Sequence, residues 1–162
     1  MEAARTVDHK IVISGDGPLR EELKSLIFKY NLKNVILTGF ISEDEKKALL
    51  RLCKAFVFPS QYRSEAFGVS LLEAQLFKKP IISCNIGTGS SFVNIHNKTG
   101  IVVPPKDVNS LSLAMNHLAK NDSLCHQLGE SGFSRFSDMF TIEKQSNSYV
   151  KLYNALINGN KN

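Results

Sequence analysis

Two glutamates, Glu65 and Glu73, flank a glycine at a spacing that suits the binding of a phosphorylated sugar. A short apolar run at residues 55–58 precedes them, and an apolar run with helical spacing follows Gly68. A helix that starts near Gly68 offers free N–H groups to a phosphate, and Glu73 then lies roughly 7–8 Å further along the helix axis. An ionised carboxylate only accepts hydrogen bonds, so it suits paired hydroxyls of a sugar or ribose. The pattern predicts a site in which the two carboxylates and the helix start between them bind a nucleotide-sugar.

Short apolar strands alternate five times with helical patterns along the chain. The expected strands are residues 9–14, 35–38, 55–58, 80–84 and 100–103. The expected helices are residues 19–30, 42–54, 69–77, 91–95, 108–121, 123–136 and 141–158. This alternation of near-continuous apolar strands with helices predicts an α/β, Rossmann-like, doubly wound parallel sheet. Tyr149 and Tyr153 are expected to pack against the fold, and residues 159–162 are expected to fray.

The loops that follow the expected strands contain the unusual residues of the chain. These loops are residues 15–18, 39–41, 60–68, 85–89 and 104–105. Ligands of doubly wound sheets bind at the carboxyl ends of the strands, and all of these loops belong to that edge. The topology therefore predicts one binding site there, which includes Glu65.

The composition fits one ordinary domain and argues against several function classes. The chain has 162 residues, 43% of them hydrophobic, with a net charge of +5 that is spread along the sequence. Such mild basicity fits an anionic ligand or a membrane surface, whereas nucleic-acid binding calls for a basic patch that is not present. No apolar leader or membrane-spanning stretch occurs, so we expect a cytoplasmic protein, with peripheral contact at the inner face of the plasma membrane.

Cofactors and metals are not expected. The turn at residues 15–20 lacks the third glycine of a dinucleotide fingerprint because Arg20 stands there, and no Walker motif is present. The four histidines show no metal-ligand spacing, and no Asp-x-Asp occurs. Three well-separated cysteines, Cys53, Cys84 and Cys125, are expected to act as small apolar residues within the fold.

The run from Glu65 to Glu73, with Lys79-Pro80 and a further strand after it, resembles the E-x7-E signature of family 4 (group 1) glycosyltransferases of the GT-B fold. The resemblance extends from Lys10 to Tyr153. Its other landmarks are Gly15-x-Gly17-Pro18, Gly39, Phe58-Pro59-Ser60, Thr99-Gly100, Pro104-Pro105 and Asp107. Residues 63–68 and 85–94 are most similar to mannosyl- or rhamnosyltransferases of bacterial O-antigen and other surface polysaccharides. The chain would thus be one half of a GT-B fold.

This resemblance implies roles for individual residues. Glu65 would be the catalytic-site residue that contacts the donor sugar hydroxyls, while Glu73 would hold the ribose. The diphosphate would face the backbone of Phe67, Gly68, Val69 and Ser70. The family retains the anomeric configuration without a metal, and the departing diphosphate takes part in proton transfer. Stabilisation of that diphosphate should then supply most of the rate.

Three further loops receive a role from the resemblance and also have a plain structural explanation. Gly15 and Gly17 would border the nucleotide pocket, although a tight turn before a helix explains them nearly as well. Phe40 and Ile41 would belong to a loop that presents backbone groups to the base, or simply to a turn. Gly87 would offer its N–H to sugar or phosphate, or only connect a strand to a short helix.

Residues 1–162 are expected to be a single donor-binding domain, the carboxyl-terminal half of the GT-B fold. The family's Arg and Lys for the diphosphate, and its amino-terminal acceptor domain, are expected upstream. Alone, the domain should bind a UDP-, GDP- or dTDP-linked sugar weakly and transfer nothing. The whole enzyme would pass a hexose to a polysaccharide or lipid-linked oligosaccharide. The alternatives are a non-catalytic nucleotide-sugar-binding module and a sugar-nucleotide epimerase of the same fold.

Overall fold

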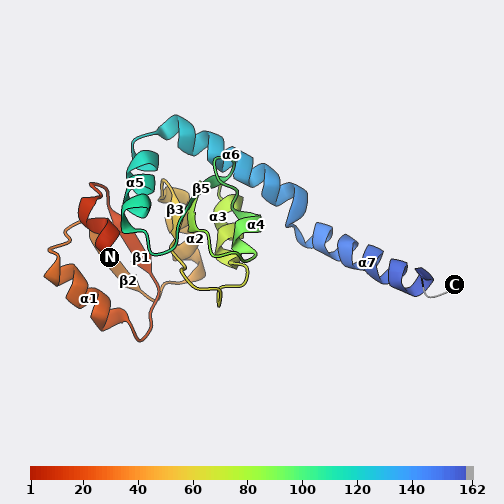
Figure 1. The fold of residues 1–162 in the computed structure, drawn as a ribbon, viewed down its shortest axis with the longest axis horizontal. Helices are drawn as coiled ribbons and strands as arrows, with labels where there is room; N and C mark the ends of the chain where they lie inside the picture. The colour runs from red at the N-terminus through yellow and green to blue at the C-terminus, as the bar shows by residue number, and fades with distance from the viewer. Residues whose placement is uncertain (160–162) are drawn as a thin grey trace.

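The computed structural model describes residues 1–159, in which strands and helices alternate as the sequence predicts (Figure 1). The strands are β1 (Ile11–Ser14), β2 (Val35–Gly39), β3 (Phe56–Phe58), β4 (Ile81–Cys84) and β5 (Gly100–Val103). The helices are η1 (Glu2–Thr6), α1 (Arg20–Lys29), α2 (Glu43–Leu52), α3 (Val69–Leu76), α4 (Ser90–Val93), α5 (Val108–Ala119), α6 (Asp122–Met139) and α7 (Ile142–Gly159). The expected fraying falls on Gly159, which instead ends α7, and on residues 160–162, which lie outside the described part.

Every strand pairs in parallel, which confirms the α/β class, but the strands form two sheets. β1 pairs with β2, and a separate three-stranded sheet has the order β3-β4-β5. Within residues 1–159 no ladder joins β1 to β3, so the doubly wound arrangement is divided at that point. Hydrophobic periodicity locates strands and does not determine which edges pair, so the sequence did not reveal this division.

The three-stranded sheet is covered on both faces. Ile81 and Ile82 are fully buried, and their side chains point to opposite faces because neighbouring strand residues alternate. Ile82 packs with residues of α5 and α6, including Leu118, in a core that also contains Cys84 and Cys125. Ile81 packs with Leu50, Leu71, Ala74 and Val93. Cys84 and Cys125 are buried as expected, whereas Cys53 is only partly buried.

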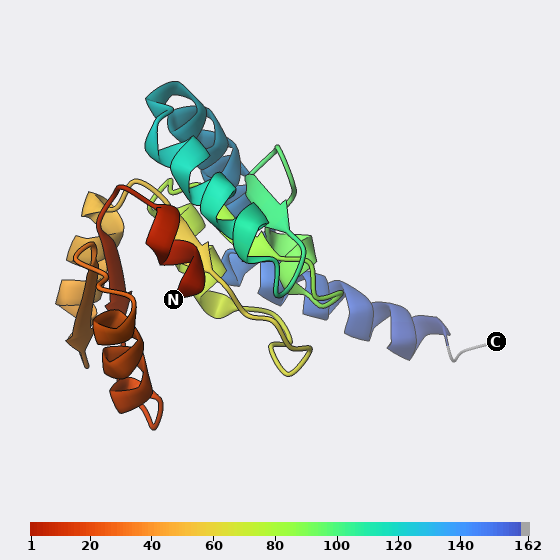
Figure 2. The same ribbon diagram turned by 60° about the vertical axis from the view of Figure 1, so that its left-hand side comes forward.

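The β1–β2 sheet is covered on one face only. Ala4 of η1 packs with Leu32 and Val35 under the side chains of α1. On the other face, Val12 is 43% exposed and Ile36 is 44% exposed. Figure 2 shows η1 and α1 beside this sheet. The sequence reasoning missed η1, which has only five residues and no helical repeat.

The last helix, α7, extends away from both sheets (Figures 1 and 2). None of its residues is buried. The Tyr149 and Tyr153 rings stack on each other with centroids 6.3 Å apart, yet each remains more than half exposed. The expectation that they pack against the fold was therefore wrong. Within residues 1–159 no helix combines the length and apolarity needed to cross a membrane.

Candidate active site

Helix α3 begins where the sequence predicts, and only glycine fits the residue before it. Gly68 has a left-handed backbone with φ +83°. A Cβ there would lie 2.9 Å from Leu71 Cδ1 and 3.2 Å from Phe58 Cζ, so any other residue would have to displace the buried Leu71 side chain as well as adopt a left-handed backbone. Among the described residues no side chain caps this helix. The Leu71 N–H already donates to the Gly68 carbonyl at 2.9 Å, whereas the Val69 and Ser70 amides before it are available to an anion.

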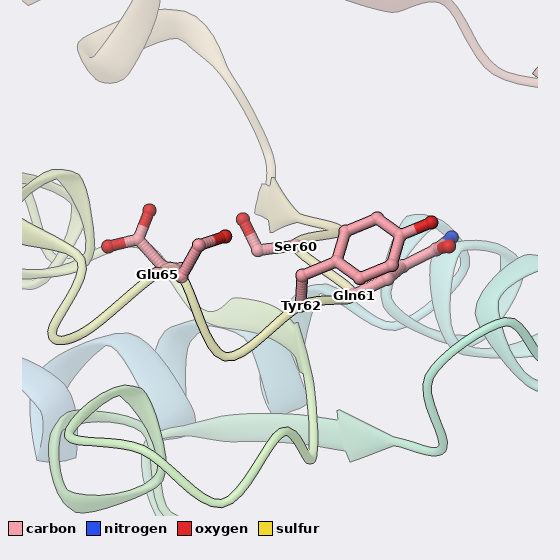
Figure 3. A pocket seen from close by; sticks show the side chains of 5 residues that line it. Ser60, Gln61, Tyr62 and Glu65 are labelled. Atoms are coloured by element: carbon pink, nitrogen blue, oxygen red, sulfur yellow. The ribbon is translucent and has the colours of Figure 1, made fainter.

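Glu65 lies in the loop between β3 and α3, beside a shallow hollow. The hollow has a volume of about 210 Å³ and is lined by Ser60, Gln61, Tyr62, Ser64 and Glu65. The Glu65 N–H donates to the Tyr62 carbonyl at 3.2 Å, which folds the loop into a turn. Figure 3 shows the Glu65 and Ser60 side chains on the same side of this loop. The Glu65 carboxylate makes no hydrogen bond or ion pair with any described residue, so its oxygens are free to accept from hydroxyls.

Glu73 lies in the second turn of α3 and is paired with a residue that the sequence reasoning missed. Its side chain is 34% exposed, and its Oε1 lies 2.8 Å from Lys46 Nζ of α2. Lys46 Nζ also lies 3.0 Å from Glu43 Oε2. The hydrogen bond to Glu73 and, after it, the one to Glu43 raise the pKa of Lys46. The spacing of Glu43 and Lys46 along α2 indicates their pairing, but nothing in the sequence connects either residue to Glu73.

A capping box at Ser42 fixes the start of α2, where a helix over residues 42–54 is expected. The Glu45 N–H donates to Ser42 Oγ at 3.3 Å, and the Ser42 N–H donates to Glu45 Oε2 at 2.7 Å. These bonds to Ser42, the backbone one first, lower the pKa of Glu45. The box directly follows Phe40 and Ile41, so it fixes the point where their loop meets the helix that carries Lys46.

The loops after β3 and β4 lie together. The Gly89 N–H donates to the Ala66 carbonyl at 2.9 Å. Gly87 has φ +65°, and a Cβ at this residue would lie 3.7 Å from Arg63 Nη1. The Phe67 ring packs edge-on against Phe140 with centroids 6.2 Å apart, so it faces the interior. With the ring packed there, the Phe67 backbone is the part of this residue that we expect to face the site, as the resemblance implies.

The loops after β1 and β2 also lie together, as a second group. The Gly15 N–H donates to the Gly39 carbonyl at 2.9 Å. Asp16 Oδ1 accepts from the Gly17 N–H at 2.8 Å, so the tight-turn explanation of these glycines is sufficient. Arg20, paired with Asp16 at 3.2 Å, lies against Gly39, whose backbone is left-handed with φ +73°.

The two loop groups make no hydrogen bond to each other within residues 1–159. The first group contains Glu65, Phe67, Gly68 and Gly87 and continues into Val69 and Ser70 at the start of α3. The second group contains Gly15, Gly17, Phe40 and Ile41. The Lys46–Glu73 ion pair joins the helix that follows the second group to the helix that follows the first. No cluster of three or more His, Cys, Asp or Glu residues suited to a metal occurs in the same described part.

Comparison with known proteins identifies the family. Residues 1–135 match the family model described as glycosyl transferases group 1. The chain belongs to this family. It is 42% identical over 157 residues to O-antigen chain mannosyltransferase C of Escherichia coli, a match that covers 97% of this chain and 42% of that protein. It is also 40% identical to D-rhamnosyltransferase WbpZ of Pseudomonas aeruginosa, over 93% of this chain and 44% of that protein. The chain thus spans less than half of these relatives.

Solved structures place this group 1 chain in the GT-B class. The crystal structure of TarM superposes with a TM-score of 0.84 at 28% identity, over 94% of this chain and 31% of that one. The sucrose-phosphate synthase of Thermosynechococcus elongatus also gives 0.84, at 26% identity, over 97% of this chain and 41% of that one. Anabaena HepE in complex with UDP-glucose gives 0.81 over 94% of this chain and 43% of that one, where 19% identity shows the fold alone. Nothing in these matches favours the epimerase or the non-catalytic module.

Proposed function

We propose that this chain binds the nucleotide-diphosphate sugar of a retaining glycosyltransferase that transfers a hexose to a polysaccharide or lipid-linked oligosaccharide. One observation carries the proposal: the uncapped start of α3 at Gly68 lies between Glu65 and Glu73. Free amides and the positive end of the helix dipole favour a diphosphate there. The carboxylates, before the helix and in its second turn, favour a hydroxyl-bearing group on either side of it.

Glu65 is the residue that we assign to the donor sugar. Its carboxylate is unpaired among the described residues and lies beside the hollow of about 210 Å³. We assign the ribose to Glu73 and the base to the loop that contains Phe40 and Ile41. Phe40 is 84% exposed, so its ring is accessible to a flat ligand.

The chemistry that we assign to the site is stabilisation of the departing diphosphate. Negative charge develops on this group as the glycosidic bond breaks, and the amides of residues 68–70 are already oriented at the helix start. The diphosphate then accepts the proton of the attacking acceptor hydroxyl, with retention at the anomeric carbon. No metal or other cofactor is needed in this scheme.

Several comparisons support the assignment of substrate and partners. One TarM structure and one HepE structure contain UDP, and another HepE structure contains UDP-glucose. We propose UDP-, GDP- or dTDP-linked hexose as the class of donor. The relatives named for O-antigen mannose and for D-rhamnose support a surface-polysaccharide acceptor. Because the chain covers 42% of the first relative, we propose that an amino-terminal domain of the same enzyme binds this acceptor, at the cytoplasmic face of the membrane.

Calorimetric titration with UDP, GDP and dTDP tests the proposal. We expect one of them to bind, and Glu73→Gln to weaken it about tenfold or more, because a charge-assisted hydrogen bond contributes about 1.5–3 kcal/mol. Glu65→Gln should weaken binding of the matching nucleotide-sugar more than binding of the free nucleotide. Glu143→Gln, in the first turn of the exposed α7, is the control. Absence of binding by all three nucleotides, or equal losses for both ligands in Glu65→Gln, would contradict the assignment.

A further inference from the structure

The ion pair between Lys46 of α2 and Glu73 of α3 points to a function for Lys46 at the nucleotide site. We infer that Lys46 is a positioning residue for the ribose: it orients the Glu73 carboxylate and offsets its charge beside the diphosphate. This inference rests on the proposed nucleotide site, because it describes how that site is held in a binding-competent state. It predicts that Lys46 controls discrimination between ribose and deoxyribose without touching the ligand.

The geometry holds the ammonium group of Lys46 between two carboxylates. Lys46 Nζ lies 2.8 Å from Glu73 Oε1 and 3.0 Å from Glu43 Oε2. Glu43 stands on the same helix three residues earlier, where side chains meet on one face. It therefore pre-orients Lys46 towards α3. Although lysine side chains are usually well exposed, this one is only 33% exposed, so it has less conformational freedom to lose than a surface lysine.

The pair leaves Glu73 able to accept further hydrogen bonds. Only Oε1 is engaged, and Oε2 has no partner among the described residues. A carboxylate offers about four lone-pair sites, so a ribose diol can still bind while Lys46 remains attached. A carboxylate that is fixed at one oxygen also loses less rotational freedom when hydroxyls bind to the other.

The positive charge of Lys46 is the second reason to expect that this residue supports nucleotide binding. Glu73 lies in the second turn of the helix whose start is proposed to hold a diphosphate, Glu43 lies beside the same ammonium group, and the Lys46 charge offsets one of these two negative charges. Without Lys46, both carboxylates would repel the ligand, and partly exposed charges at such range are screened only incompletely at ordinary ionic strength. The hydrogen bonds to Glu73 and then to Glu43 raise the pKa of Lys46, so the ammonium group is stabilised in its charged form.

Two other roles for Lys46 make opposite predictions. If the ion pair only joins α2 to α3, its loss lowers stability and leaves ligand preference unchanged. If Lys46 competes with the ribose for Glu73, its removal strengthens binding. A positioning role instead predicts weaker binding together with reduced preference for the ribose form.

The experiment is calorimetric titration of the 162-residue chain with UDP and GDP, each beside its 2′-deoxy analogue. We expect the wild type to prefer the ribose form of the nucleotide that binds. Lys46→Met should weaken that form about three- to tenfold and reduce the preference, and Lys46→Arg should restore most of both. Lys47→Met is the matched control, because Lys47 pairs with Asp44 on the same helix and faces solvent. In a Glu73→Gln background, Lys46→Met should have little further effect.

The outcomes separate this inference from the proposed function. Nucleotide binding with an unchanged ribose preference in Lys46→Met, or tighter binding in that variant, overturns the role of Lys46 and leaves the nucleotide site intact. A wild type that binds but shows no ribose preference overturns the role of Lys46 together with the assignment of the ribose to Glu73, and leaves the proposed diphosphate site at the start of α3. A wild type that binds none of UDP, GDP and dTDP overturns both, and one that binds dTDP alone overturns only the role of Lys46 in ribose preference. Thermal unfolding of each variant identifies any that fails to fold, and Lys46→Gln then replaces Lys46→Met.

Discussion

The two sheets of this molecule are built from similar strands but are buried very differently. All residues of β4 are buried, and helices cover both faces of its sheet. In β1, half-buried residues alternate with exposed ones, because only one face of that sheet is covered. The same parallel ladder therefore rests on a two-sided core in one region and a one-sided core in the other. Burial of apolar area is the main stabilising term, so the free energy of unfolding should be concentrated in the β3–β5 region.

The candidate site contains residues from both regions. The well-packed region carries the residues proposed for the sugar and diphosphate, and the more exposed region carries the loop proposed for the base. The residues proposed for sugar and diphosphate, Glu65 and Gly68, lie on the well-packed side. The loop proposed for the base, which contains Phe40, follows the more exposed sheet. A rigid frame suits the group whose charge changes during the reaction, because preorganised donors lower the barrier only if they do not have to move.

The largest expected difference between the two regions is in the stability cost of shortening a strand residue, which is buried in one region and exposed in the other. Ile82→Ala should lower the free energy of unfolding by about 2–5 kcal/mol, because it leaves a cavity in a closed core. Val12→Ala should cost less than about 1 kcal/mol, because the Val12 side chain is already 43% exposed. Urea unfolding of both variants measures the difference. Similar costs would mean that the two regions are equally well packed.

The next largest difference is expected between alanine substitutions of the glycines that precede α3 and α1. Gly68→Ala should cost about 1–3 kcal/mol, because it forces a side chain into a left-handed conformation against Leu71 Cδ1. Gly17→Ala should change stability by less than about 0.5 kcal/mol, since a Cβ there meets nothing within 4 Å. Thermal unfolding compares the two. A tolerated alanine at residue 68 would contradict the described start of α3.

A smaller effect is expected from the cap of α2. Ser42→Ala should cost about 1 kcal/mol, because it removes the side-chain half of the capping box. It should also weaken nucleotide binding, because α2 carries Lys46 and follows the Phe40 loop. Ser148→Ala on α7 is the control, since its hydroxyl only donates back to the Lys144 carbonyl. A Ser42→Ala variant with unchanged stability would show that packing alone holds α2.

The smallest effect is a pH dependence shared by the two regions. Hydrogen bonds to Ser42 lower the pKa of Glu45, and hydrogen bonds to Ser110 lower the pKa of Asp107. A lowered pKa in the folded state gives stability that is present above the unfolded pKa and lost as the pH falls through the folded one. Acidification from about pH 5 to pH 3 should therefore lower the melting temperature. A Glu45→Gln, Asp107→Asn double variant should show a flatter profile, and an equally steep one would contradict these assignments.

Much of the fold follows from local pattern. The turn glycines and alternating apolar runs predict the strands and helices, and the Ser42–Glu45 box predicts the start of α2 because its partners are only three residues apart. The start of α3 at Gly68 is equally local. The division into two sheets is not, because it depends on which strand edges meet.

The same distinction separates the predicted from the missed parts of the site. The spacing of Glu65 and Glu73 around a glycine is enough to predict them as site residues. Lys46 is 27 residues from Glu73 in sequence, and its pairing arises from the packing of α2 beside α3. Helical periodicity likewise predicts α7 but does not say what its apolar face contacts, so the packing expected of Tyr149 and Tyr153 was wrong.

The two cysteines in the core of the β3–β5 region give the chain a built-in probe of its own opening. Burial raises the pKa of the Cys84 and Cys125 thiols, and alkylating reagents react with the thiolate. Modification in the folded state is therefore slow for two reasons: the reagent has little access to the buried sulfur atoms, and only a small fraction of the thiols is ionised. The rate at which iodoacetamide labels these two residues would report how often this half of the molecule opens, with no dye or tag attached.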